Sequence, residues 1–177
     1  DVYNATLYFS NMEDKTYKGM RVTLNMKTGE VTSFSQYGDD IKSEKEPDEE
    51  KTLKAAEEAA KYFMGEKFSE YKLKNQNGYY VTYVRYVNGI ECPSDSVSIA
   101  FADNNKLSSF YMSYTDAEFP DASNIMGVEE ALGKLHSYAD YRPEYIRNGD
   151  KYILVYDFDD YCEFDAVTGE KTEIDVQ

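Results

Sequence analysis

The feature of this chain that most constrains its fold is an internal repeat. The segment MRVTLNMKTGEVTSFS begins at Met20, and a related segment, DYCEFDAVTGEKTEID, begins at Asp160. Both contain Thr-Gly-Glu at the same position, with apolar residues alternating with polar ones around it. A looser third copy, SVSIAFADNNKLSSFYMS, begins at Ser96. A strand–turn–strand pattern that recurs in this way predicts a fold assembled from copies of one motif.

Turn signals support antiparallel pairing of the repeated strands. Residues 27–30, Lys-Thr-Gly-Glu, place glycine where a hairpin turn requires a positive φ. Asn77-Gly78 and Asn88-Gly89 are further hairpin signals, and Asn148-Gly149 repeats the first of them. We therefore expect a series of β-hairpins.

Two helices are predicted between the strands. The first should run from Glu49 to Met64, because Asp48 can cap its start and Gly65 can end it. Its apolar stripe is Leu53, Ala56, Ala60, Phe63 and Met64. A second, shorter stripe consists of Val128, Ala131, Leu132 and Leu135. We expect both stripes to be buried against the strands.

The helices and strands together indicate an α+β fold of tandem repeats, each a helix packed on an antiparallel sheet built of hairpins. The expected divisions are a partial N-terminal repeat over 1–47, a full repeat over 48–118 and a shortened repeat over 119–177. Because the chain begins at Asp1 rather than Met, we interpret it as processed or trimmed.

The net charge of −15 and a pI near 4.4 exclude the usual nucleic-acid-binding proteins, which need clustered basic residues. Anionic membrane surfaces are disfavoured for the same reason. No apolar run reaches the roughly 20 residues of a membrane-spanning helix. A protein partner or a neutral glycan remains compatible with the composition.

Few residues in the chain are chemically reactive. His136 is the only histidine, which excludes a His-rich metal site, and it should cap the end of the second helix. Cys92 and Cys162 lack an activating neighbour and are either buried strand residues or, in an exported protein, a disulfide pair. We expect no catalytic residue, no cofactor and no enzymatic activity.

One acidic stretch could hold a cation. Asp157, Asp159 and Asp160 could supply oxygen ligands to Ca²⁺, but the spacing of an EF-hand loop is absent. We expect Asp159 and Asp160 to form a turn between two strands, with calcium binding as the alternative.

Tyrosines are the remaining candidates for an interaction surface. The chain has 18 tyrosines and no tryptophan. Those on adjacent predicted strands are Tyr79, Tyr80, Tyr83, Tyr86, Tyr111 and Tyr114. Amphipathic tyrosines suit half-buried sheet positions, which is the structural interpretation. The functional interpretation is a sheet face formed by Tyr80, Tyr83, Tyr86, Tyr111 and Tyr114 that binds a protein or a glycan.

Three motifs resemble the YcdB/YcdC repeat family of Gram-positive bacteria. They are the R-x-V-N-G-I stretch from Arg85 to Ile90, the Glu-Glu-Ala helix entries at 57–59 and 129–131, and the hairpin that contains Thr-Gly-Glu. The resemblance extends from about Glu49 onward and includes the 20–35 hairpin. The last repeat departs from the pattern, because it lacks the Arg and the Asn-Gly-Ile step.

The resemblance implies exported proteins built of PepSY-like repeats, which are associated with peptidase propeptides and peptidase inhibition at the cell envelope. It therefore implies an extracellular or cell-surface location, with a lipid anchor upstream of this chain as one form of attachment. We expect a non-catalytic binding module that inhibits or regulates a peptidase. The alternative is an adhesion or glycan-binding module that uses the tyrosine-rich face.

Overall fold

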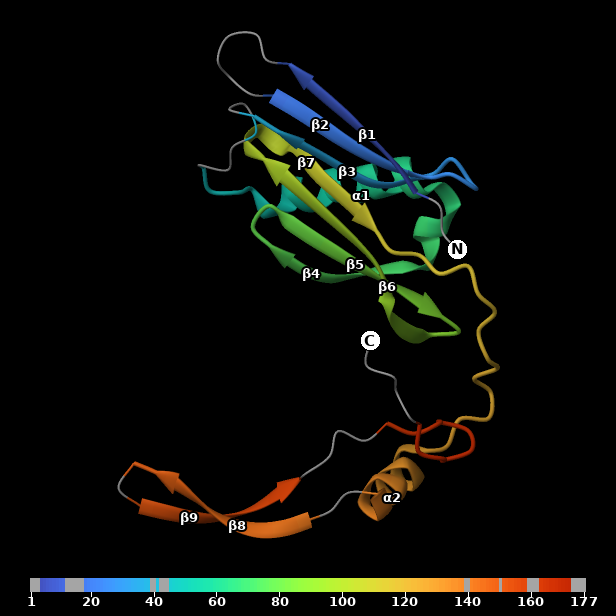
Figure 1. Cartoon of the computed structure of the whole chain (residues 1–177), viewed down its shortest axis with the longest axis vertical. Helices are drawn as coiled ribbons and strands as arrows, with labels where there is room; N and C mark the ends of the chain where they lie inside the picture. Colours follow the sequence, from blue (N-terminus) through green and yellow to red (C-terminus); the bar gives the residue numbers. More distant parts are fainter. Residues whose placement is uncertain are drawn as a thin grey trace. The chain divides into compact units, whose positions relative to one another are not determined.

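The computed structural model describes residues 4–11, 18–38, 41, 45–138, 141–149, 151–158 and 163–172. These residues form a large antiparallel sheet, a two-stranded sheet and two α-helices, so the predicted α+β class is confirmed (Figure 1). The chain divides into two compact units, Asp1–Phe119 and Pro120–Gln177. The division into three tandem repeats stays a prediction.

The first unit contains a seven-stranded sheet with the order β1-β2-β3-β7-β6-β5-β4. Its elements are β1 (Asn4–Asn11), β2 (Lys18–Asn25), β3 (Val31–Tyr37), α1 (Glu49–Met64), η2 (Gly65–Glu70), β4 (Tyr71–Asn77), β5 (Tyr80–Val87), β6 (Ile90–Ala102), η3 (Asp103–Asn105) and β7 (Lys106–Met112). The β3–β7 pair joins a three-stranded meander, β1–β3, to a four-stranded meander, β4–β7. One apolar row runs across six of the seven strands, from β1 to β5: Leu7, Val22, Phe34, Phe110, Ile99 and Val81.

Helix α1 begins and ends at the predicted residues, because the residues that cap it lie directly at its ends. The Asp48 carboxylate accepts a hydrogen bond from the Lys51 backbone N–H at 3.2 Å, and Gly65 ends the helix at a φ of +59°. The helix lies across one face of the sheet, which we call the helix side (Figure 1). Ala56 and Ala60 are fully buried there, and their small side chains let the helix approach the strands closely.

The core of the first unit lies between α1 and β5–β7. Phe63 of α1 stacks on Phe110 at a centroid distance of 4.4 Å and on Phe34 at 6.4 Å. The fully or almost fully buried residues beneath the helix include Val81, Val97, Ile99, Phe101 and Phe110. Burial of these apolar surfaces is what holds the helix to the sheet.

The two Thr-Gly-Glu turns have the same hydrogen bonds, 140 residues apart. The Asn25 carbonyl accepts from the N–H of Gly29, whose φ is +75°. The Asp165 carbonyl accepts from the N–H of Gly169, whose φ is +71°. In each turn the side-chain oxygen of the first residue also accepts two backbone N–H bonds. The repeated sequence therefore encodes a repeated turn geometry.

The second unit contains α2 (Val128–Tyr138), β8 (Tyr141–Asn148) and β9 (Lys151–Phe158), followed by the Thr-Gly-Glu turn. The expected burial of the α2 stripe is wrong for this structure. No described residue of α2 is buried, and Val128 and Leu132 are 77% and 47% exposed. Within this unit the helix contacts the turn through Tyr138, whose hydroxyl donates to the Gly169 carbonyl at 2.7 Å. A two-stranded sheet has no broad apolar face to receive the stripe.

Candidate functional site

The five tyrosines predicted to form one surface are separated by the strands that carry them. Tyr80 and Tyr111 lie on the face opposite α1, which we call the open face, and are 68% and 57% exposed. Tyr83 points to the helix side, is 4% exposed and packs edge-on against Phe68. Tyr80 and Tyr83 are three positions apart on one strand, so the alternation of side chains places them on opposite faces.

The other two tyrosines are half-buried and have charged neighbours. The Tyr86 hydroxyl hydrogen-bonds to the Glu91 carboxylate at 3.0 Å, and the Lys72 ammonium lies over its ring. The Tyr114 ring lies 4.4 Å from the Arg85 guanidinium carbon and 4.5 Å from the Lys67 ammonium. Of the five tyrosines, the structure therefore presents Tyr80 and Tyr111 as open to a partner.

Removing the hydroxyl of Tyr83 tests whether this residue serves only the packing of the core. Burial raises the pKa of its phenol to about 12, and its hydroxyl has no hydrogen-bond partner in the described part of the chain. Because a buried unpaired hydroxyl is destabilising, we expect Tyr83→Phe to leave the free energy of unfolding unchanged or raise it by up to about 1 kcal/mol. Urea denaturation followed by circular dichroism would measure this. A loss of more than 1 kcal/mol would show that the hydroxyl has a partner.

The open face carries mainly hydroxyl-bearing and aromatic side chains. One row across it is Thr6, Thr23, Ser33, Tyr111, Ser98 and Thr82. The next row is Tyr8, Arg21, Ser35, Ser109, Ala100 and Tyr80. Tyr8 is 68% exposed and lies beneath the Arg21 guanidinium. Sequence reasoning missed Tyr8 and Arg21, because their position depends on the strand order.

A hollow of about 510 Å³ lies where the two meanders separate. The ladder between β3 and β7 covers three residue pairs and ends at Ser33 and Tyr111, and a bulge interrupts β2 at Thr23. The residues around the hollow are mainly polar: Asn4, Arg21, Thr23, Asn25, Glu30, Thr32, Ser33, Tyr111, Met112, Ser113 and Tyr114.

An ion pair holds one wall of this hollow in place. The Lys67 ammonium lies 2.5 Å from the Glu30 carboxylate, and this hydrogen bond lowers the pKa of Glu30. The Thr28 hydroxyl donates a further hydrogen bond to the same carboxylate. Glu30 is therefore held in its ionised form beside Lys67.

The two edges of the seven-stranded sheet differ in their chemistry. Edge strand β4 (YKLKNQN) has two lysines and an irregularity between Leu73 and Asn75. Edge strand β1 (NATLYFSN) has no charged residue and no proline, and it pairs with β2 in unbroken register over eight residues. Lysines and bulges are the devices by which proteins prevent pairing with foreign strands. Edge β4 is thus protected and edge β1 is not.

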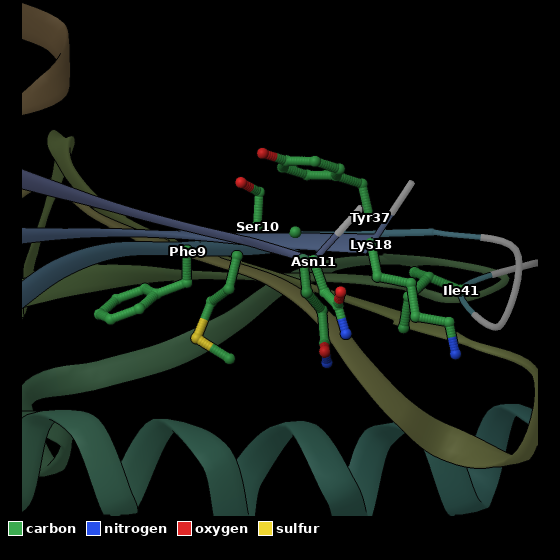
Figure 2. A pocket seen from close by; sticks show the side chains of 9 residues that line it. Phe9, Ser10, Asn11, Lys18, Tyr37 and Ile41 are labelled. Carbon is green, nitrogen blue, oxygen red and sulfur yellow. The ribbon is translucent and has the colours of Figure 1, made fainter. Parts of the chain in front are cut away.

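The helix side of the sheet is uncovered near β1. Leu7, Phe9 and Met20 are 45%, 54% and 36% exposed, and we call them the apolar ledge. A shallow hollow of about 320 Å³ adjoins the ledge. Figure 2 shows Phe9 and Lys18 projecting to the side of the sheet where α1 lies, whereas Ser10 and Tyr37 project to the other side. Exposed contiguous apolar residues of this kind mark interaction sites.

Arg85, the first residue of the R-x-V-N-G-I motif, is structural. It is 6% exposed, and its guanidinium lies 2.9 Å from the Asp95 carboxylate and 2.6 Å from that of Glu70. Asn88 and Gly89 both have positive φ, at +53° and +82°, as the tight hairpin between β5 and β6 requires. The motif thus forms the turn between β5 and β6 and supplies a buried arginine that pairs with Asp95.

The described residues contain no group of three His, Cys, Asp or Glu side chains that could hold a metal ion. His136 lies in the last turn of α2, where it was predicted. Cys92 is a half-buried free thiol. Cys162, Asp159, Asp160 and the side chain of Asp157 lie outside what the structure describes. Within the described part of the chain, no helix has the length and hydropathy to cross a membrane.

Comparison with known proteins identifies the family to which this chain belongs. The C-terminal domain of YpeB from Bacillus megaterium is a similar solved structure, with 15% sequence identity and a TM-score of 0.44 over 96% of this chain and 88% of that domain. No curated protein sequence matches the chain. The family model described as the YcdB, YcdC repeated domain matches residues 2–114, which span all seven strands of the large sheet and α1. The chain therefore belongs to the YcdB/YcdC repeated-domain family, as its motifs predicted.

Proposed function

We propose that this protein is an exported, non-catalytic binding module that regulates a peptidase at the cell envelope by pairing its β1 edge with an extended segment of the enzyme. Family membership supports the binding role, because the resemblance implies PepSY-like modules, which are associated with peptidase propeptides and inhibition. Peptidase clefts hold polypeptides in extended conformation, and an exposed sheet edge offers that conformation in advance.

The observation that carries the proposal is the asymmetry between the two sheet edges. A regular, uncharged edge of eight residues invites pairing with another strand and is an aggregation hazard unless a partner covers it. The opposite edge has lysines and an irregular register, so this chain uses protective devices where no pairing is required. We infer that β1 is left unprotected because a partner binds there.

Lysines on β1 should abolish this pairing. We expect the double variant Thr6→Lys/Tyr8→Lys to lose at least 10-fold in the amount of peptidase retained on the immobilised protein, because edge lysines oppose strand addition. The measurement is a pull-down of secreted and envelope proteins with identification by mass spectrometry. Hydrolysis of a fluorogenic peptide by the captured peptidase, with and without the module, then measures regulation.

The matched control is Asn75→Lys/Asn77→Lys, which adds lysines to the open face of the other edge strand. This variant should retain the peptidase as the wild type does. If the β1 variant retained as much peptidase as the wild type, the proposal would be contradicted. It would also be contradicted if the module left the rate of peptide hydrolysis by the captured peptidase unchanged.

A glycan-binding module is the second candidate, and the open-face hollow favours it. The hollow combines amide, hydroxyl and tyrosine side chains with the Arg21 guanidinium and one paired carboxylate, a set of hydrogen-bonding groups that suits a polar ligand such as a glycan. Tyr80→Ala/Tyr111→Ala should leave peptidase retention intact under the first proposal. Loss of binding to purified cell wall by the same variant would favour the second.

A further inference from the structure

We propose that the hollow of about 510 Å³ on the open face binds a sugar acid, which is a saccharide unit that carries a carboxylate, and that the Arg21 guanidinium binds this carboxylate. The inference rests on the glycan-binding candidate of the proposed function and names the class of its ligand. It does not depend on strand pairing at β1.

Arg21 is a cation at the hollow that lacks an anionic partner. It lies opposite Tyr8 and Ser35 on the open face, with its guanidinium carbon 5.6 Å from the centroid of the Tyr8 ring. Although the chain has 34 acidic residues, Arg21 forms no ion pair with any residue that the structure describes. A guanidinium has several N–H donors and no acceptor, and its planar fork matches the two oxygens of a carboxylate. Arg21 is therefore available to a carboxylate of the ligand.

The carboxylate that lines the hollow does not neutralise Arg21. Glu30 is the acidic side chain among the described lining residues, and the Lys67 ammonium lies 2.5 Å from one of its oxygens. The Thr28 hydroxyl donates to the other oxygen at 3.0 Å. The charge of Glu30 is thus balanced by Lys67, whereas the charge of Arg21 is not. Salt screens the acidic residues elsewhere on the surface, because the Debye length is about 8 Å at physiological ionic strength.

The neutral part of the lining indicates a hydroxylated ligand. The hydroxyls of Ser33 and Tyr111 and the side-chain amide of Asn4 make no hydrogen bond with any described residue. Each of these groups can donate and accept hydrogen bonds, as the hydroxyls of a sugar do. Apart from the tyrosine rings, the apolar side chain among the described lining residues is Met112, which is 6% exposed. This lining favours a saccharide over a peptide, whose hydrophobic side chains need apolar pockets.

The test compares sugar acids with their neutral esters on the intact chain. The probes are trigalacturonic acid and a hyaluronan tetrasaccharide, each with its fully methyl-esterified form, and N-acetyl-triglycine as a carboxylate without sugar hydroxyls. Isothermal titration calorimetry should give a Kd at least 10-fold lower for one or both acids than for the matching ester and for N-acetyl-triglycine. In an NMR titration with that acid, the backbone amide signals of Asn25, Ser33 and Tyr111 should shift.

Variants of Arg21 test its role in the discrimination between acid and ester. Arg21→Gln should weaken binding of the acid at least 10-fold and leave the ester unchanged, because it removes the charge and keeps a polar side chain. Arg21→Lys retains the charge without the planar fork, so it should recover part of the loss. The matched control is Lys72→Gln, which removes a positive charge from an exposed lysine of β4 outside the lining. It should leave every Kd unchanged, and circular dichroism should show that all three variants are folded.

The possible outcomes separate this inference from the proposed function. Equal affinity for each acid and its ester, or acid binding that Arg21→Gln leaves unchanged, would overturn the inference and leave the glycan-binding candidate standing. N-acetyl-triglycine that binds as tightly as the sugar acids would overturn it in favour of a peptide carboxylate. Binding of no saccharide would overturn both the inference and the glycan-binding candidate. None of these outcomes alters the retention of a peptidase through β1, which the lysine variants of that strand test.

Discussion

Replacing Asp95 with alanine is expected to destabilise the first unit by about 3–5 kcal/mol, because it removes the buried carboxylate beside the Arg85 guanidinium and leaves only the half-exposed carboxylate of Glu70. Asp95 is fully buried, and one oxygen lies 2.9 Å from Arg85. The other oxygen accepts hydrogen bonds from the backbone N–H and the hydroxyl of Thr115, at 3.0 and 2.8 Å. The substitution therefore also removes the tie to the chain that follows β7. Urea denaturation monitored by circular dichroism would measure the loss.

Glu70 is the matched control for Asp95, because it contacts the same guanidinium from the surface. Its side chain is 47% exposed, so solvent screens its charge. Glu70→Gln should reduce the free energy of unfolding by about 1 kcal/mol or less. Equal losses for the two variants would mean that Asp95 is not the principal partner of the buried arginine.

Phe110→Ala should cost about 3–5 kcal/mol, since it opens a cavity at the centre of the core. Phe110 is fully buried, stacks on Phe63 of α1 and pairs with Phe34 across the junction of the two meanders. The cavity would weaken both the contact of the helix with the sheet and the link between the meanders. Thermal and urea unfolding would both report the change.

Tyr62→Ala serves as the comparison on the same helix. Tyr62 is 84% exposed and contacts Phe63 edge-on. Its removal should change the free energy of unfolding by about 0.5 kcal/mol or less. A loss below 1 kcal/mol for Phe110→Ala would show that α1 is not docked on the sheet as described.

Local signals predicted the elements of this fold accurately. Helix α1 begins and ends where Asp48 and Gly65 indicated, since capping and glycine conformation depend on neighbouring residues alone. The Asn88-Gly89 hairpin likewise forms where it was expected. The burial predicted for α2 was wrong, because burial depends on the surface that a helix meets and not on its own stripe.

The candidate site was only partly predictable. Side-chain alternation alone separates Tyr80 from Tyr83, whereas the predicted tyrosine surface groups residues by strand and not by face. The place of Tyr8 and Arg21 on the open face could not be predicted, because it requires the pairing of β3 with β7 across more than 70 residues. The partnership of Arg85 with Asp95 depends on the irregular register between β5 and β6.

Helix bounds, hairpin turns and family membership could all be derived from residues close together in the chain, because caps, turns and short motifs act over a few residues. The tertiary structure decided which edge of the sheet is unprotected, which face carries the tyrosines and which arginine is buried. The strand order depends on the pairing of β3 with β7, which are distant in the chain, and the burial of Arg85 depends on an irregular register, neither of which a local turn signal specifies.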